Sequence, residues 1–308
     1  MTEKELLKQL EKELNKHYKD TESVLRTKID DFTKNFDKNN KLQLKLLNDG
    51  KISEKEYKTW YKEQVTTAKW SRKMIDELSN DIANANVKAS ELINRYTSEI
   101  YLKGCIEASV EFEDMLGFDL INRKQINRLL NDNKSLLPKV NPSVSKDKLW
   151  NQRRMKSAVL QSALKGESIP KLAKRLEIVV GMNKTSAMRN ARTMMTASHN
   201  QGKLDMGYEA AEMGIKLQKK WLATFDDRTR DSHIEMHGEI VDFDEEFSNG
   251  LMFPADPDGD DPAEIYNCRC TYRYVHDEKR SGISREEFQK NVDRVKKLKE
   301  ERRRGNQN

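Results

Sequence analysis

The first 47 residues constrain the fold more than any other stretch, because residues 2–47 contain neither glycine nor proline. Within them, Leu6, Leu10 and Leu14 recur at the spacing of one helix face, and further apolar residues continue the pattern as far as Phe36. This periodicity predicts one long amphipathic helix or two abutting helices. Such a helix buries only a narrow apolar stripe, so it needs other long helices to pack against.

Two more long helices are expected before residue 117. Residues 48–50 (Asn-Asp-Gly) predict a turn, and Ser53 with Glu56 forms a capping box that starts a second helix running past Leu78. A third helix is expected from about residue 82 to 116. Short connections between three long helices favour an antiparallel bundle or hairpin. The aromatic side chains of this region are expected to be core residues: Trp60, Tyr61, Trp70, Tyr96 and Tyr101.

The composition agrees with long helices that each bury a narrow stripe. Charged residues make up 35% of the chain and hydrophobic residues 36%, and the mean hydropathy is −0.92. No window approaches the roughly 18 consecutive apolar residues of a membrane-spanning helix, and residues 1–4 start no signal peptide. Three cysteines cannot form a full set of disulfides, which favours a reducing compartment.

A change of character after Gly117 indicates a domain boundary. Prolines and a polar run mark residues 121–145 as a linker that contains a short helix. We therefore expect a long-helix domain over 1–120, a second module over 146–276 and a basic helical tail over 277–308.

The start of the second module predicts three short basic helices. The first covers residues 147–164, the second ends at Gly181, and the third runs from about Thr185 to 213. Three such helices have a spacing compatible with a DNA-binding helix-turn-helix, although a plain three-helix packing unit is the more common arrangement.

After residue 214 the hydrophobic period changes from helical to alternating. Strands are expected over 215–222, 241–243 and 272–275, with a short helix over 228–236 capped by Asp226 or Asp227. Another helix is expected from about Ser284. The predicted fold class is α+β, predominantly helical, with a short antiparallel sheet near the C-terminus.

Charge is strongly segregated along the chain. Residues 124–220 carry 20 basic and 7 acidic side chains, whereas residues 226–264 carry 2 basic and 14 acidic ones. Clustered Lys and Arg are typical of phosphate binding, so the basic segment and the tail are the expected DNA contacts. The alternative is that the acidic run is an internal partner that competes with DNA. The candidate DNA-binding residues are Lys148, Arg153, Arg154, Lys156, Lys171, Lys174, Arg175, Lys184, Arg189, Arg192, Arg302, Arg303 and Arg304.

Two histidines and two cysteines in the acidic module have the residue types of a metal site. His233 and His237 are four apart, on one face of a helix, and Cys268 and Cys270 are two apart, on one face of a strand. Together they are a candidate tetrahedral zinc set, although the C-x-C spacing is tighter than the usual C-x(2–4)-C. The alternative is that they only pack and form hydrogen bonds.

Catalytic signatures are approached but not completed. The tripeptide 233–235 (His-Ile-Glu) matches half of the zinc deaminase motif, but Asn267 stands where that motif has proline and the cysteines are too close together. A zinc-dependent hydrolase or deaminase using His233, Glu235, Cys268 and Cys270 is therefore the alternative function. Residues 256–261 start like a calcium loop, but their glycine comes too early. No phosphate-binding glycine-rich loop is present, and non-enzymatic function is expected.

The second module resembles the phage head-morphogenesis (Mu F-like) family of minor capsid proteins of tailed bacteriophages. The similarity covers about residues 150–275 and rests on Trp221, Asp226, Arg228, Arg230, His233, Gly238, Asn267, Cys268 and Cys270. In that pattern His237 has no fixed counterpart, so Asp231 is an equal candidate for a fourth zinc ligand.

The resemblance implies a low-copy virion protein inside the capsid near the portal vertex, assembled in the host cytoplasm. It would bind double-stranded DNA without sequence preference and assist head assembly and genome packaging, ejection or protection. Its expected partners are the portal protein, through residues 1–120, and a scaffolding or major capsid protein. No membrane partner is expected.

Overall fold

The computed structural model describes residues 1–66, 69–116, 138–165, 167, 169–212, 215–275 and 297. The expected linker helix, the expected helix after Ser284 and the arginines 302–304 lie outside these residues. No helix in the described ranges is both long and apolar enough to cross a membrane.

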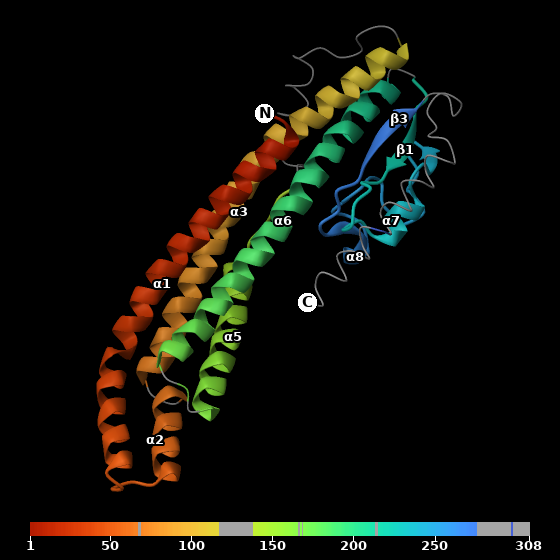
Figure 1. Cartoon of the computed structure of the whole chain (residues 1–308). Coiled ribbons are helices and arrows are strands. Elements are labelled where there is room, and N and C mark those ends of the chain that lie inside the picture. The colour runs from red at the N-terminus through yellow and green to blue at the C-terminus, as the bar shows by residue number, and fades with distance from the viewer. Residues whose placement is uncertain are drawn as a thin grey trace. The chain divides into compact units, whose positions relative to one another are not determined.

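Five long or medium helices make up most of the described part of the chain (Figure 1). They are α1 (Glu3–Asn48), α2 (Glu54–Thr66), α3 (Lys69–Leu116), α5 (Val144–Leu164) and α6 (Ile169–Glu212). The first is one continuous helix rather than two abutting ones. The predicted capping box is present: the Ser53 backbone N–H donates to Glu56 Oε2 (2.8 Å) and the Glu56 N–H donates to Ser53 Oγ (3.2 Å).

Two predicted helix boundaries are wrong. The second and third helices do not meet near residue 80, because α3 runs unbroken from Lys69 through the buried Leu78, Ser79 and Ile82. Gly181 does not end a helix either, since it lies inside α6, which is 44 residues long. A glycine inside a helix costs only about 1 kcal/mol, which long-range packing readily offsets. With two long helices in place of three short ones, the helix-turn-helix interpretation is also wrong.

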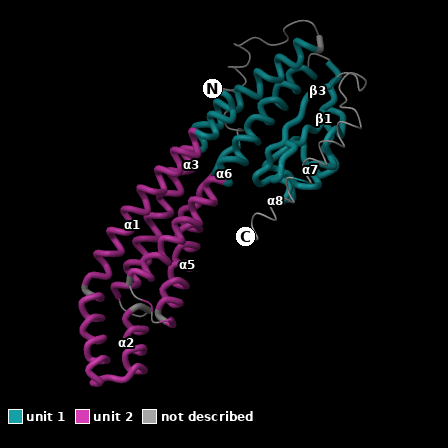
Figure 2. The backbone as a smooth tube through the Cα atoms, viewed as in Figure 1, with its two compact units in different colours: residues 1–8, 93–140, 189–308 teal, residues 9–92, 141–188 magenta. Residues whose placement is uncertain are grey.

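The described chain divides into two compact units (Figure 2). Unit 1 comprises Met1–Lys8, Ile93–Val140 and Arg189–Asn308, and unit 2 comprises Gln9–Leu92 and Asn141–Met188. Each unit therefore combines segments from both sides of the expected linker at 121–145, and α3 and α6 contribute to both.

Unit 2 is a helical bundle whose core contains a chain of hydrogen-bonded polar side chains. Tyr18 on α1 donates to Asn86 on α3 (2.8 Å), and Asn86 Nδ2 in turn donates to Asn183 on α6 (2.8 Å). The Asn183 amide donates to Asn151 on α5 (2.8 Å). Buried amides stay favourable only when paired, so this chain of bonds specifies how four helices pack. Burial of Tyr61, Tyr96 and Tyr101 confirms that the aromatic stripe is largely core.

Unit 1 contains a three-stranded antiparallel sheet of order β2-β1-β3. Its strands are β1 (Gln218–Leu222), β2 (Ile240–Asp242) and β3 (Thr271–Val275), close to the predicted positions. Two short helices, α7 (Asp231–Glu235) and α8 (Pro262–Ile265), lie in the connections. The register pairs Trp221 with Tyr272 and Lys219 with Tyr274. A mostly helical chain with this small antiparallel sheet confirms the predicted α+β class.

Two glycines bring α3 and α6 into very close contact within unit 1. A Cβ added at Gly202 would lie 2.2 Å from the backbone oxygen of Tyr101, and one added at Gly104 would lie 1.9 Å from that of His199. The Cys105 thiol also donates to the Gly202 carbonyl (3.4 Å). Only residues without a side chain allow the two backbones this close.

A buried ionic cluster ties the same helices to the sheet. Lys203 on α6 is fully buried, and its Nζ donates to Glu107 (2.8 Å) and Glu111 (2.6 Å) on α3. The second carboxylate oxygen of Glu111 accepts the backbone N–H of Tyr274 on β3 (2.9 Å). Burial raises the pKa of Glu111, whereas at Glu107 the effect of burial is outweighed by His199 and Lys203, which lower its pKa to about 2.

The glycine contact leads to a stability prediction. Gly202→Ala should lower the free energy of unfolding by about 1–3 kcal/mol, because its Cβ would overlap backbone atoms that cannot move independently. Gly181→Ala on the same helix is the control. Nothing lies within 4 Å of its added Cβ, so it should be neutral or stabilise by about 0.5–1 kcal/mol. Urea denaturation followed by circular dichroism measures both, and equal effects would contradict the close helix contact.

Candidate functional site

His233, Cys268 and Cys270 converge in the interior of unit 1. Their side-chain nitrogen and sulfur atoms all lie within 4.8 Å of one another. His233 Nδ1 is 3.4 Å from Cys270 Sγ and 3.6 Å from Cys268 Sγ. All three residues are at most 2% exposed. Of the four predicted ligands, the structure thus brings together one histidine, on α7, and the two cysteines that precede β3.

Glu264 on α8 completes the surroundings of the histidine ring. Its Oε2 lies 2.8 Å from His233 Nε2, so with a proton on Nε2 the ring donates to this carboxylate. That tautomer leaves the Nδ1 lone pair facing the two sulfurs. Glu264 also accepts from Ser232 (3.2 Å) and Asn249 (3.3 Å), which hold the carboxylate in place.

The two thiols differ in their tendency to ionise. A hydrogen bond from Cys268, helped by His233, lowers the pKa of Cys270 to about 5. The same pairing, together with burial, raises the pKa of Cys268 well above its ordinary value. The group offers two soft sulfur ligands together with an imidazole nitrogen.

A polar row on α6 positions the cysteine segment. Thr193 accepts the backbone N–H of Asn267 (3.0 Å), and Thr196 donates to the Cys268 carbonyl (2.9 Å). One turn further, Asn200 donates to the Cys270 carbonyl (3.2 Å) and accepts from Thr271 (2.8 Å). Sequence analysis missed these residues, whose only signal is a threonine or asparagine recurring on an otherwise apolar helix face.

Asn267 has a backbone role. Its φ of 57° is in the left-handed region, and its side chain is exposed. Asparagine tolerates this conformation better than most other residues, which explains its place directly before the first cysteine. The turn it makes joins α8 to the segment held by α6.

The acidic and basic residues after β1 form a turn that is hydrogen-bonded to residues 266–269, around the first cysteine. The Asp226 carboxylate accepts both guanidinium nitrogens of Arg269 and the backbone N–H of Arg228 (2.9 Å). Arg230 donates to the Tyr266 carbonyl, and Thr224 donates to the Arg269 carbonyl (2.5 Å). The predicted helix cap at Asp226 or Asp227 is wrong, because Asp226 is used in this turn and α7 starts only at Asp231.

Trp221 and Gly238 frame the site from β1 and the end of α7. The buried Trp221 ring meets the His233 ring edge-on at 5.3 Å between centroids. Gly238 has a φ of 91°, which favours glycine, and its N–H donates to the Trp221 carbonyl (2.9 Å). Most of the motif residues therefore build the framework around His233 and the cysteines, whereas the Arg228 side chain is largely exposed.

The remaining candidate ligands lie elsewhere. The Nδ1 of His237 accepts the backbone N–H of Ala223 (3.0 Å), and its ring packs edge-on against Phe225. Neither His237 nor Asp231 belongs to the group of possible ligands found among the described residues. Glu235 is exposed on α7, so Glu264 rather than Glu235 is the carboxylate at the buried histidine.

In the candidate calcium loop, the Asp256 carboxylate accepts hydrogen bonds from backbone groups of the loop itself. The Asp256 carboxylate accepts the backbone N–H groups of Met252 (3.1 Å) and Asp258 (3.0 Å). Burial raises the pKa of Asp256. A carboxylate used in this way holds the loop rather than facing a solvent-accessible cation.

The candidate DNA-binding residues fall into two sets. Arg153, Arg154, Lys156, Lys171 and Lys174 are exposed on α5 and α6 of unit 2. Arg154 also lies over the Trp150 ring (5.2 Å). Three further candidates among the described residues are engaged: Arg175 with Glu167 (2.5 Å), Lys148 with Asp76 (3.0 Å), and Arg189 over the Tyr266 ring (4.7 Å). Lys184 and Arg192 are partly buried.

Comparison with known proteins identifies the second half of the chain. The family described as "Phage Mu protein F like protein" matches residues 153–273. The "Minor head protein GP7" of Bacillus phage SPP1 is 24% identical over 221 residues, which cover 65% of this chain and 68% of that protein. No solved structure matches the chain.

Two other curated relatives are longer proteins. The "NAD(+)--arginine ADP-ribosyltransferase EFV" of Enterococcus faecalis is 33% identical over 185 residues, which cover 56% of this chain. An uncharacterized protein of Haemophilus influenzae is 27% identical over 218 residues, which cover 67% of this chain. The aligned region spans only 34% of the first relative and 43% of the second.

His237 gives a pH prediction. Burial, with Lys220 and Arg273 nearby, lowers its pKa from the ordinary 6.5 to about 4. Between these values the unfolded chain binds a proton that the native chain does not, so stability is complete above pH 6.5 and falls as the pH drops towards 4. In His237→Asn, whose amide oxygen can still accept from Ala223, thermal melting should fall less over this range. An unchanged pH dependence would contradict the assignment.

Proposed function

We propose that this chain, which belongs to the phage head-morphogenesis (Mu F-like) family, is a minor head protein that binds DNA without sequence preference inside the capsid, near the portal. Family membership rests on residues 153–273 and on the similarity to the SPP1 minor head protein. A head protein is part of the virion. DNA binding, portal association and assistance in packaging, ejection or protection of the genome are the proposed parts of this function.

The exposed basic residues of unit 2 carry the DNA-binding proposal. Helix α5 has five basic side chains and one acidic one, and residues 153, 154 and 156 point their charges to solvent. Lys171 and Lys174 add two exposed charges on α6. These side chains have the mobility and charge to meet phosphates, and no base-reading motif accompanies them. Such a surface supports binding that is strongly salt-dependent and indifferent to sequence.

A lysine-lined hollow on unit 2 supports the same proposal. It lies between α1 and α6, and its charged lining residues are Lys16, Lys19 and Lys184 together with one acidic residue, Glu22. Lys16 and Lys19 are exposed. Sequence analysis missed these two lysines because the N-terminal third has almost balanced charge. A phosphate group of the DNA backbone suits a hollow of this kind.

An apolar set on α5 supports a protein partner. Leu149, Leu160 and Leu164 are 53%, 44% and 66% exposed, and their spacing places them on one side of the helix. Large apolar side chains gathered on one exposed helix face are typical of protein–protein contacts. The portal protein is the partner that the family resemblance implies, and α5 is a surface for it in addition to residues 1–120. The proposal leaves the scaffolding and major capsid proteins as further possible partners.

Enzymatic activity is not part of this proposal. The similarity to the Enterococcus ADP-ribosyltransferase covers about a third of that protein, so the named activity can belong to the remainder. The alternative zinc-dependent hydrolase would need Glu235 beside the metal ligands, but Glu235 is exposed whereas His233 is buried. The residues around the site are used in hydrogen bonds that hold the fold.

The DNA proposal predicts a charge-specific loss of binding. Replacing Arg153, Arg154 and Lys156 by alanine should weaken binding to random-sequence duplex DNA. The slope of log K against log salt should become shallower by about 2–3, because each lost phosphate contact contributes about 0.9. Fluorescence anisotropy at several salt concentrations measures both quantities.

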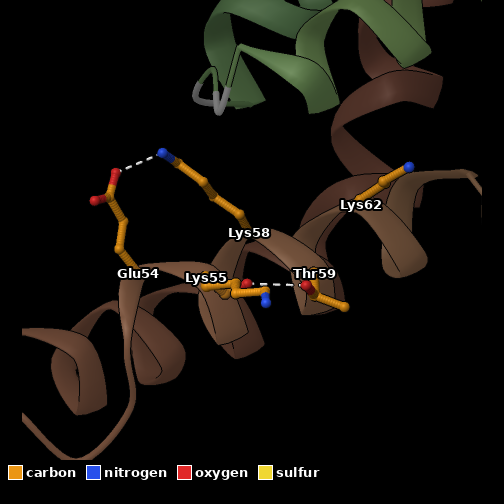
Figure 3. A pocket seen from close by; sticks show the side chains of 5 residues that line it. All are labelled: Glu54, Lys55, Lys58, Thr59 and Lys62. Atoms are coloured by element: carbon orange, nitrogen blue, oxygen red, sulfur yellow. Dashed lines mark hydrogen bonds and ion pairs between the residues drawn. The ribbon is translucent and has the colours of Figure 1, made fainter.

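A matched control lies on α2. Lys55, Lys58 and Lys62 form an exposed row beside Glu54, to which Lys58 is paired at 2.5 Å (Figure 3). This helix carries three lysines and three glutamates, so its field is balanced. Their triple alanine variant should bind DNA almost as well as the unaltered chain. Equal losses in the two variants, or no binding at low salt, would overturn the DNA proposal.

The portal proposal predicts the opposite pattern. Serine at Leu149 and Leu160 should reduce co-purification with the portal protein, because it removes exposed apolar contact area, while DNA affinity stays the same. The triple alanine variant of α5 should retain more portal protein than this serine variant. Pull-down from infected cells with quantitative mass spectrometry measures the ratio, and unchanged recovery of the portal protein would count against α5 as the contact.

A further inference from the structure

We propose that His233, Cys268 and Cys270 bind one zinc ion that holds the C-terminal module of unit 1 together. The three ligands come from α7 and from the segment before β3, two places 35 residues apart in sequence. A zinc ion shared between them would connect these elements by bonds stronger than hydrogen bonds. This site goes beyond the proposed role in the phage head and does not depend on it.

The two nitrogen–sulfur separations match those of a tetrahedral zinc site. With zinc–sulfur and zinc–nitrogen distances of about 2.3 and 2.0–2.1 Å, tetrahedral geometry places nitrogen and sulfur about 3.5 Å apart. The two distances from His233 Nδ1 to the sulfurs are 3.4 and 3.6 Å. Both sulfurs therefore lie at the right separation from the same nitrogen.

Hydrogen bonds alone satisfy this arrangement poorly. The Nδ1 atom has a single lone pair when Nε2 carries the proton, yet two sulfur atoms approach it. One thiol at most can donate to it with good geometry, and the other contacts of the sulfurs are with each other and with the backbone N–H groups of Thr224 and Cys270. A cation at the centre satisfies the nitrogen and both sulfurs at once.

Glu264 provides the support typical of a zinc-bound histidine. Such histidines usually donate their second ring N–H to a carboxylate, which fixes the ring and its tautomer. Here Glu264 Oε2 lies 2.8 Å from His233 Nε2, on the side of the ring opposite the sulfurs. Sequence analysis did not place Glu264 beside His233, because α8 and α7 are brought together only by the fold.

Burial indicates a structural rather than a catalytic metal. All three ligands are at most 2% exposed, and the Trp221 ring packs against the histidine. Structural zinc sites are closed in this way, whereas catalytic sites keep a position open to substrate. The three side chains fill three of the four positions of a tetrahedral site, so the structural assignment rests on their burial and not on the number of ligands. His237 is excluded from the set because its Nδ1 accepts from Ala223.

Metal analysis and cobalt substitution test the proposal on the full chain. Protein purified without chelators should contain about one zinc per chain by mass spectrometry of the metal. Exchange with Co²⁺ should give sulfur-to-cobalt charge-transfer absorption and the visible bands of tetrahedral cobalt. The cobalt spectrum needs no substitution, so it remains decisive if a ligand variant fails to fold.

Matched variants identify the ligands. Cys268→Ser, Cys270→Ser and His233→Ala should lose the metal, whereas Cys105→Ala, which removes the buried cysteine on α3, and His237→Asn should keep it. Glu264→Gln should keep one zinc but release it to a competing chelator about 10–100 times more readily. A folded chain that contains no zinc and gives no thiolate–cobalt absorption would overturn the proposal. Equal metal loss in Cys105→Ala would overturn it as well.

Discussion

The contact between one face of α6 and the segment 267–271 is the interaction on which the rest of unit 1 depends. Thr193, Thr196 and Asn200 bind backbone groups of this segment, which leads into β3 at the edge of the described sheet. Buried backbone groups without partners are costly, so this row determines the direction in which the chain enters β3. That direction in turn places both cysteine sulfurs beside the histidine of α7.

The other motif residues hold or orient the groups around this segment. Asn267 turns the chain, Asp226 receives Arg269, and Glu264 orients His233. The residues by which this chain resembles the Mu F-like family thus largely hold one another, around a buried group of three potential metal ligands. Among the acidic residues of this module, Asp256 accepts hydrogen bonds from backbone N–H groups of its own loop. The basic residues available for phosphate lie instead on α5 and α6 of unit 2.

Periodicity predicted the type of most elements well but not their limits. The unbroken pattern from Leu6 to Phe36 made α1 predictable, whereas Gly181 suggested a helix end that packing overrides. The i, i+2 cysteines and the nearby histidine predicted part of the site. The contacts of Glu264 with His233 and of Asn200 with the Cys270 carbonyl could not be predicted, because the fold alone joins residues that are 31 and 70 positions apart in sequence. Similarly, no sequence signal distinguished the exposed arginines of α5 from Arg175, which is paired with Glu167.

The division of labour between a folded acidic module and a basic helical surface is the central claim, and photo-crosslinking tests it most directly. A photoreactive phenylalanine analogue can replace Trp150 on α5 or Tyr266 beside the cysteine segment, two aromatic residues that are 39% and 40% exposed. In DNA-filled heads, we expect covalent DNA adducts from position 150 and almost none from position 266. Adducts mainly from position 266, or none from position 150, would contradict this division.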